Sequence, residues 1–216
     1  MKYFNGILYV GLIILLACLG GCISRSIPQI TQTTSQPVTS SPAVIKLSTI
    51  EPSDMALKLP DLPAGFKVQE MSERTPSGLN QLAVDLGWKK GYYVAFQRGN
   101  VDSALIQQTI SVYSIEKFYP IKIQIGNTSL GKVNQILFWA KTDLLSAANE
   151  SIKIDELYDP KIGDSSQAFR YRHNGYTAFI IQFVKNDVFE DIRIGGSSPD
   201  YETLKKLAMT AAEKVK

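Results

Sequence analysis

The sequence predicts an α+β fold, in which an antiparallel sheet ends in a three-strand meander and packs against helices that include a C-terminal helix. Three observations support this prediction. Residues 104–114 alternate apolar and polar side chains, as in a strand with one dry face and one wet face. Three strand-like runs follow one another between residues 167 and 194, joined by two-residue turns. Helical spacing of apolar residues marks 132–148 and the end of the chain.

The first half of the domain is expected to contain three strands and one short helix. Residues 66–73 follow a Pro-rich stretch and form the first predicted strand, and Pro76-Ser77-Gly78 opens a helix over 79–86. Residues 92–98 alternate, with Tyr92, Val94 and Phe96 on one side. In the predicted strand over 104–114, Ile106, Ile110 and Val112 lie on the apolar face. Gln107, Thr109 and Ser111 lie on the opposite, polar face.

The second half ends in the clearest pattern of the chain. The runs 167–172, 176–185 and 188–194 are joined by Asn174-Gly175 and Asn186-Asp187, which are typical hairpin turns. The middle run is apolar on both faces and is expected to be central. Ser198-Pro199-Asp200 starts the final helix, with Pro199 predicted in its first turn. Its apolar face comprises Leu204, Leu207, Ala208, Ala211 and Val215. We expect the helices to cover one side of the sheet.

The N-terminus has the pattern of an export signal. Lys2 is positively charged, and residues 7–19 form an apolar run that is too short for a full membrane span. Leu19-Gly20-Gly21-Cys22 resembles a lipobox, and the resemblance implies that Cys22 is lipidated and becomes the mature N-terminus. Residues 1–22 are therefore predicted to be a lipoprotein-type signal peptide. An uncleaved short anchor remains the alternative.

A tether is predicted to follow the signal. Fifteen of the 22 residues from 23 to 44 are Ser, Thr, Gln or Pro, and such a stretch buries too little apolar surface to fold. We therefore divide the chain into a disordered tether over 23–45 and a single globular domain over 46–216. Asn127 and Asn149 begin N-glycosylation sequons, whose use outside the membrane is left open.

Composition excludes several classes of function. The chain has 23 basic and 20 acidic residues, and the charges from residue 46 onward nearly cancel, so no electrostatic basis for binding nucleic acid remains. The two cysteines, Cys18 and Cys22, both lie in the signal region. The domain therefore has no disulfide framework and too few Cys and His residues for a zinc site. We expect no metal and no cofactor.

Catalytic candidates are few. His173 is the single His and precedes a turn, which favours a solvated residue over a general base. No nucleophile elbow or phosphate-binding loop is present. The acidic stretch Asp155, Glu156, Asp159 and Asp164 is most simply a solvated loop. A hydrolase that uses Asp159 and Asp164 remains the third-ranked hypothesis, and it requires the two carboxylates to converge.

Aromatic side chains are the remaining candidates for a site. Trp88, Tyr92, Tyr113 and Tyr171 could line a concave face that binds a sugar, a peptide or a lipid headgroup. Aromatic residues on strands more often pack in the core or against a neighbouring strand, and this alternative stays open.

Short motifs along the domain carry a resemblance. They are Leu62-Pro63-Ala64-Gly65-Phe66, Gly91-Tyr92-Tyr93-Val94-Ala95-Phe96, Ile162-Gly163-Asp164-Ser165, Phe183-Val184-Lys185-Asn186 and Leu204-Lys205-Lys206-Leu207-Ala208. Over residues 57–216 the chain resembles uncharacterised prokaryotic extracytoplasmic lipoproteins. It is loosely similar to PsbP-like domains and to the extracellular sensor domains of mycobacterial serine/threonine kinases. The resemblance implies an α+β fold and a non-catalytic role in binding, sensing or assembly.

These patterns together predict a lipid-anchored binding or sensing domain on the outer face of the cytoplasmic membrane. Its partners would be the membrane, through the anchor, and a small ligand or an envelope protein. The alternative is a structural or assembly factor that contacts another envelope protein.

Overall fold

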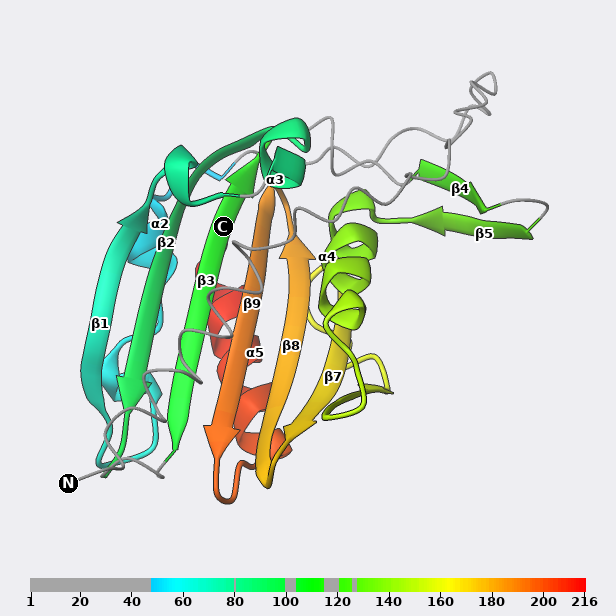
Figure 1. Cartoon of the computed structure of the whole chain (residues 1–216). Coiled ribbons are helices and arrows are strands. Elements are labelled where there is room, and N and C mark those ends of the chain that lie inside the picture. Colours follow the sequence, from blue (N-terminus) through cyan, green and yellow to red (C-terminus); the bar gives the residue numbers. More distant parts are fainter. Residues whose placement is uncertain (1–47, 80, 100–103, 115–120, 126–127) are drawn as a thin grey trace.

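Seven antiparallel strands form the main sheet in the order β1-β2-β3-β9-β8-β7-β6 (Figure 1). The computed structural model describes residues 48–79, 81–99, 104–114, 121–125 and 128–216. The strands are β1 (Lys67–Arg74), β2 (Trp88–Gln97), β3 (Leu105–Tyr113), β6 (Ile152–Leu157), β7 (Ser165–His173), β8 (Tyr176–Lys185) and β9 (Val188–Gly196). The predicted α+β class, with its antiparallel sheet, C-terminal meander and C-terminal helix, is confirmed.

The meander folds as its turns predict. Asn174 and Gly175 have positive φ angles of 46° and 79°, which suit a two-residue hairpin turn that Asn and Gly adopt at low cost. Strand β8 lies between β7 and β9, and β9 pairs with β3, which joins the N-terminal and C-terminal halves of the sheet.

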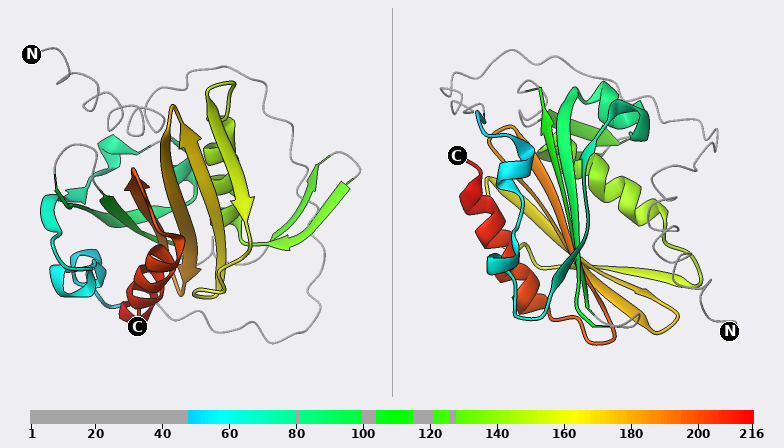
Figure 2. Two further views of the ribbon diagram at one scale, coloured as in Figure 1. Left: turned by 90° about the horizontal axis from the view of Figure 1, so that it is seen from below. Right: turned by 90° about the vertical axis from the view of Figure 1, so that its left-hand side faces the viewer.

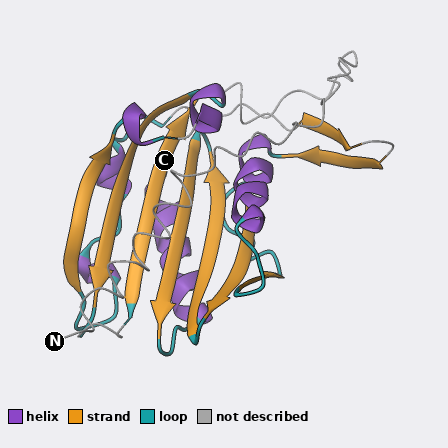
Figure 3. Ribbon diagram, viewed as in Figure 1, coloured by secondary structure: helices purple, strands orange, loops and turns teal. Residues whose placement is uncertain are grey.

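Helices cover both faces of the sheet, so the prediction that they cover one side was wrong. The right-hand view of Figure 2 shows α5 (Tyr201–Lys214) and α2 (Pro52–Met55) on one side and α4 (Gln135–Ser146) on the other. Two short 3-10 helices, η1 (Leu59–Asp61) and η2 (Pro76–Gly78), and the short helix α3 (Gln81–Asp85) complete the set (Figure 3). We call the two sides of the sheet the α5 face and the α4 face.

The main core lies on the α5 face. Leu204, Leu207, Ala208 and Ala211 of α5 are buried, as the helical pattern predicts. They belong to one apolar cluster with side chains of the central strands, including Ile110, Ile181, Phe183 and Ile192. The helix starts at Asp200, whose carboxylate accepts the backbone N–H of Thr203 at 2.8 Å. Pro199 therefore precedes the N-cap and does not lie in the first turn.

A smaller apolar cluster holds α4 to the opposite face. It comprises Leu86, Tyr113, Ile136, Leu137, Val184 and Phe189, with Trp88 and Trp139 packed against it. The predicted helix over 132–148 is confirmed only from Gln135, because residues 128–133 form strand β5 (Thr128–Val133) of a hairpin with β4 (Ile121–Ile125). This hairpin extends away from the main sheet (Figure 1).

Strand β6 corrects the interpretation of the acidic stretch. Asp155 and Glu156 lie on an edge strand paired with β7 and are not in a loop. Asp155 forms ion pairs with Arg170 at 3.1 Å and Arg172 at 2.8 Å, and the hydrogen bond from Arg170 holds the pKa of Asp155 below its usual value. The acidic side chains therefore pair across the strands.

Candidate functional site

A cavity of about 250 Å³ lies between the α4 face of the sheet and the helix α4. Its floor is formed by β3, β9 and β8, and α4 forms its opposite wall. The segment around α3 closes one end, and β6 and β7 close the other. Sequence-distant elements therefore build this site, since no single stretch of the chain lines it.

The walls of the cavity are mainly apolar. Helix α4 and its C-cap residue contribute side chains along three successive turns, and the α3 region and β6 add further aliphatic groups. These residues are Ile136, Trp139, Ala140, Leu144, Ala147, Leu79, Ala83, Leu86, Ile152 and Ile154. Two of the residues from α4 are alanines, whose small side chains leave space above the floor. Such a lining favours the apolar body of a ligand.

The floor is polar because the wet faces of the strands point into the cavity. Gln107, Thr109 and Ser111 alternate along β3, and Asp191 and Arg193 face the same side from β9. The sequence predicts the wet face of β3, but α4 and the cavity cover it. A few polar groups on an apolar background can orient a ligand by hydrogen bonds.

A ladder of polar side chains crosses three strands on this floor. Gln167 on β7 donates to Gln182 on β8 at 2.7 Å, and Gln182 donates to Asp191 on β9 at 2.7 Å. Asp191 also accepts from Nε and Nη2 of Arg193 at 2.6 and 3.0 Å. Gln182 and Asp191 are buried. The ladder supplies them with partners and fixes their orientation.

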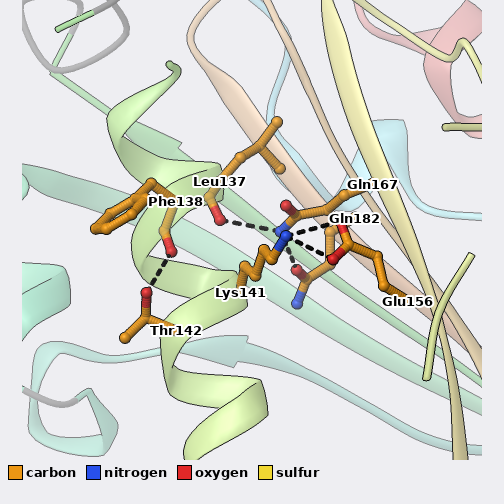
Figure 4. A network of polar contacts seen from close by, with 7 residues as sticks. All are labelled: Leu137, Phe138, Lys141, Thr142, Glu156, Gln167 and Gln182. Carbon is orange, nitrogen blue, oxygen red and sulfur yellow. Dashed lines mark hydrogen bonds and ion pairs between the residues drawn. The ribbon is translucent and has the colours of Figure 1, made fainter. Parts of the chain in front are cut away.

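The same ladder attaches α4 to the sheet (Figure 4). Nε2 of Gln167 also donates to the backbone oxygen of Leu137 at 2.9 Å. One turn later, Lys141 forms an ion pair with Glu156 of β6 at 2.7 Å. The side chain of Asn134 caps the helix by accepting the backbone N–H groups of Ile136 and Leu137. Both bonds to the sheet, from Leu137 and Lys141, lie in the N-terminal two turns of α4.

Two tyrosines line the cavity near β6. Tyr171 and Tyr176 meet edge to face, with ring centroids 6.4 Å apart. Burial raises the pKa of both phenols. The hydroxyl of Tyr176 lies over Gly195, because a Cβ atom at Gly195 would be 1.9 Å from it. The absence of a side chain at Gly195 is therefore required for this position of Tyr176.

The other end of the cavity carries Arg74, at the end of β1. Its Nη1 donates to the hydroxyl of Ser111 at 3.0 Å, and Ser111 is also hydrogen-bonded to Tyr113. Burial raises the pKa of the Tyr113 phenol, against the opposing effect of the Arg74 charge. On α4, partial desolvation raises the pKa of Asp143, against the opposing charge of Arg193.

The four aromatic candidates do not share one surface. Tyr113 and Tyr171 line the cavity at opposite ends. Trp88 packs against the small apolar cluster on the same side of the sheet. Tyr92 packs against the main core on the α5 face, since it pairs with Ile110 in register. Two of the four aromatic residues therefore line the cavity, and the other two pack against apolar clusters.

The carboxylates of the hydrolase hypothesis do not converge. Asp159 accepts from the hydroxyl of Ser166, at the start of β7, at 2.6 Å and from the backbone N–H of Lys161 in its own loop at 2.9 Å. Asp164 accepts the backbone N–H of Asn186 at 2.8 Å. Neither residue lines the cavity. Both side chains close turns.

His173 and metal binding add no further site. Nδ1 of His173 lies 3.2 Å from the backbone oxygen of Ser151, and Nε2 lies 3.1 Å from the amide nitrogen of Asn174. Among the residues that the structure describes, no group of three or more His, Cys, Asp or Glu side chains is arranged to hold a metal ion.

Sequence reasoning missed most of the cavity. Gln182, Asp191 and Arg193 are polar residues within otherwise apolar central strands, and that interruption is a signal that could have marked them. The contribution of α4 could not be recognised, because its placement over the wet face depends on tertiary packing.

Several predicted features lie outside the described residues. They are the signal peptide with Cys22, the tether over 23–45 and Asn127. Asn149 is exposed, and its side-chain oxygen accepts the backbone N–H groups of Ser151 and Ile152. Within the described ranges, no helix has the length and apolar character needed to cross a membrane.

Comparison with known proteins gives structural likenesses, two of which are described here. No protein-family model and no curated protein sequence matches the chain. The extracellular domain of PknH from Mycobacterium tuberculosis is similar with a TM-score of 0.49 at 7% identity, covering 75% of this chain and 93% of that one. The Mycobacterium smegmatis ortholog of Rv0999 is similar with a TM-score of 0.42 at 10% identity, covering 72% and 92%.

Proposed function

We propose that this protein is an extracytoplasmic lipoprotein whose domain binds a small ligand in the cavity beneath α4, without catalysing a reaction. The anchor would be Cys22, and residues 23–45 would tether the domain to the outer face of the cytoplasmic membrane. The lipobox-like Leu19-Gly20-Gly21-Cys22 and the apolar run before it support the membrane part of the proposal.

The observation that carries the binding role is the contrast between the walls and the floor of the cavity. Aliphatic and aromatic side chains surround a space whose floor presents Gln107, Thr109, Ser111 and Arg193. Ligand sites commonly combine an apolar lining with a few oriented polar groups. The volume of about 250 Å³ lies just below the usual range, so the ligand is small or protrudes from the opening.

A ligand screen with a paired variant tests the binding role. We expect at least one compound from a library of envelope sugars, peptides and small amphiphiles to raise the melting temperature of the protein. Ala147→Trp should abolish that shift, because Ala147 lines the cavity. Ala148→Trp is the matched control, since Ala148 is exposed and does not line it. A screen without any shift, or a shift equal in both variants, would contradict the proposal.

The anchor is tested separately by membrane fractionation and by incorporation of labelled fatty acid. Cys22→Ser should abolish labelling, whereas Cys18→Ser should leave it unchanged. Labelling that persists in Cys22→Ser would show that the lipobox is wrongly assigned.

An assembly role is the second candidate, and one feature favours it. Strand β1 is an edge of the sheet, and residues 67–73 are exposed on both faces, with Met71 exposed by 62%. An open edge can pair with a strand of another protein. Crosslinking from position 71 at the cell surface should then recover a partner protein, and recovery of monomer alone would argue against this role.

A further inference from the structure

The side chain of Arg74 crosses one strand to reach the floor of the cavity. Arg74, Gly91 and Ser111 are in register on β1, β2 and β3. Gly91 has no side chain between its two neighbours, and the guanidinium of Arg74 donates to the Ser111 hydroxyl at 3.0 Å. Arg74 is therefore held at the end of the cavity next to α3.

Arg74 differs from the other cation of the cavity in having no carboxylate partner. Arg193 is paired with Asp191 at 2.6 Å, which neutralises its charge on the floor. Within the residues that the structure describes, Arg74 forms no ion pair and bonds only to the neutral hydroxyl of Ser111. Its guanidinium has five N–H groups, so donors remain for a ligand.

Trp88 lies beside Gly91, the strand neighbour of Arg74, but does not line the cavity. The indole N–H of Trp88 is buried and has no hydrogen-bond partner in the described part of the chain. Its nitrogen lies 3.3 Å from the position that a Cβ atom of Gly91 would take. The unpaired guanidinium of Arg74, which does line the cavity, favours a ligand group that accepts hydrogen bonds and carries negative charge.

The charges of the lining limit that ligand to a single negative charge. Arg74 and Arg193 are balanced by Asp143 and Asp191, so the cavity as a whole is neutral. A dianion such as a phosphate monoester would find only one cation without a carboxylate partner, Arg74. It would also be repelled by the two carboxylates of the lining. Beside Arg74, the cavity continues along Leu86, Ile136 and Trp139, which suit an apolar body.

We propose that the cavity binds a small organic monocarboxylate, with its carboxylate at Arg74 and its apolar body beneath α4. This inference rests on the proposed function and specifies the class of its ligand. In the free protein, water would solvate the guanidinium of Arg74, and the carboxylate of the ligand would replace that water. Ser111 would hold the guanidinium in position.

Titration calorimetry with two pairs of probes tests this inference. The pairs are octanoate with octan-1-ol, and 3-phenylpropanoate with 3-phenylpropan-1-ol, at pH 7. The members of a pair share the apolar body and differ in the charged group. We expect at least one acid to bind the wild-type protein about tenfold or more tightly than its alcohol. Arg74→Met should remove this preference, and Arg74→Lys should keep part of it.

The control variant is Arg172→Met, which removes one positive charge from β7 outside the cavity. It should keep the preference for the acid. Binding of the alcohol to Arg74→Met shows that the cavity is still formed. Equal binding of acid and alcohol to the wild-type protein, or a preference that survives Arg74→Met, would overturn the inference and leave the proposed function standing. Failure of all four probes would overturn the inference, and the proposed function would fall with it only if the library screen also gave no ligand.

Discussion

Glu190 should make this fold less stable as the pH rises from acidic to neutral. It lies on β9 with its side chain on the α5 face, and it is fully buried in the main core. Gln108 donates to Oε2 at 2.6 Å, whereas Oε1 has no partner among the described residues. Gln108 in turn accepts the backbone N–H of Leu57 at 2.7 Å. One hydrogen bond is insufficient for a buried carboxylate.

The expected size of the effect follows from the pKa of Glu190. Desolvation raises this pKa from 4.5 to about 8, against the opposing effects of the Gln108 hydrogen bond and the charges of Lys214 and Lys185. The folded protein therefore retains a proton that the unfolded chain loses above pH 4.5. The contribution of Glu190 to stability is fully present below that pH and is lost as the pH rises through about 8. At about 1.4 kcal/mol for each unit, the loss between pH 5 and 7 is on the order of 2–3 kcal/mol.

Glu190→Gln tests this effect, because the amide resembles the protonated carboxyl in shape and does not titrate. Urea unfolding followed by tryptophan fluorescence at pH 5, 6, 7 and 8 gives the free energy of unfolding of both proteins. The difference between them should grow in favour of the variant by on the order of 2–3 kcal/mol from pH 5 to 7. Glu213→Gln, at an exposed position of α5, is the control and should show no such growth.

Parallel stability curves for the wild-type protein and Glu190→Gln would refute the reasoning. That result would mean that Glu190 is ionised in the folded protein at neutral pH. NMR of the Glu190 side-chain carboxyl as a function of pH is an independent test of whether Glu190 is protonated at neutral pH.

Three further changes have definite expected outcomes. Gly195→Ala should displace Tyr176 and lower stability by about 1–3 kcal/mol in urea unfolding, because the new Cβ would lie 1.9 Å from the tyrosine hydroxyl; an unchanged midpoint would contradict this. Asp200→Ala should cost about 1 kcal/mol by the same assay, since it removes the N-cap of α5, and a cost near zero would show that packing alone sets the start of the helix. Asp61→Asn should lower stability at pH 7. Its carboxylate is desolvated but paired with Lys214 at 2.5 Å, which together with other hydrogen bonds holds its pKa below the usual value. The deficit should therefore shrink as the pH falls below about 3.8, and a deficit that is the same at pH 3 and 7 would exclude the ion pair as its cause.

The strands and the last helix could be predicted from the sequence because their patterns are local. Alternation assigned Ile106, Ile110 and Val112 to the core side, and the structure places them there. The same alternation separates Tyr92 from Tyr113, since Tyr92 shares the face of Val94 while Tyr113 shares that of Ser111. The proposal of one aromatic ligand face overlooked this consequence.

The cavity and the placement of α4 could not be predicted, because they depend on contacts between distant segments. A polar strand face is expected to meet water, and only the assembled fold shows that α4 covers Gln107, Thr109 and Ser111. Strand β6 was missed for a similar reason. Its Asp155 and Glu156 resemble a solvated run until Arg170, Arg172 and Lys141 are seen opposite them.

The hydrogen bond and the ion pair that join α4 to the sheet lie in the first half of the helix. Its buried residues are Ile136 and Leu137, and its bonds to the sheet come from the backbone oxygen of Leu137 and the side chain of Lys141. The C-terminal half of α4 and the residue after it present Leu144 and Ala147 to the cavity. By contrast, α5 is packed along its length from Leu204 to Val215.

Because α5 packs closely on one face of the sheet and the cavity lies on the other, the two faces of β9 have separate roles. On β9, Glu190 faces the close-packed α5 side, whereas its neighbours Asp191 and Arg193 face the cavity. Because adjacent residues of a strand point to opposite faces, a change at position 190 acts on stability without removing a group from the cavity. Changes at Arg74 act on the ligand end without touching the main core. Stability and binding can therefore be varied separately in this fold, and that separation makes the tests at Glu190 and at Arg74 independent of one another.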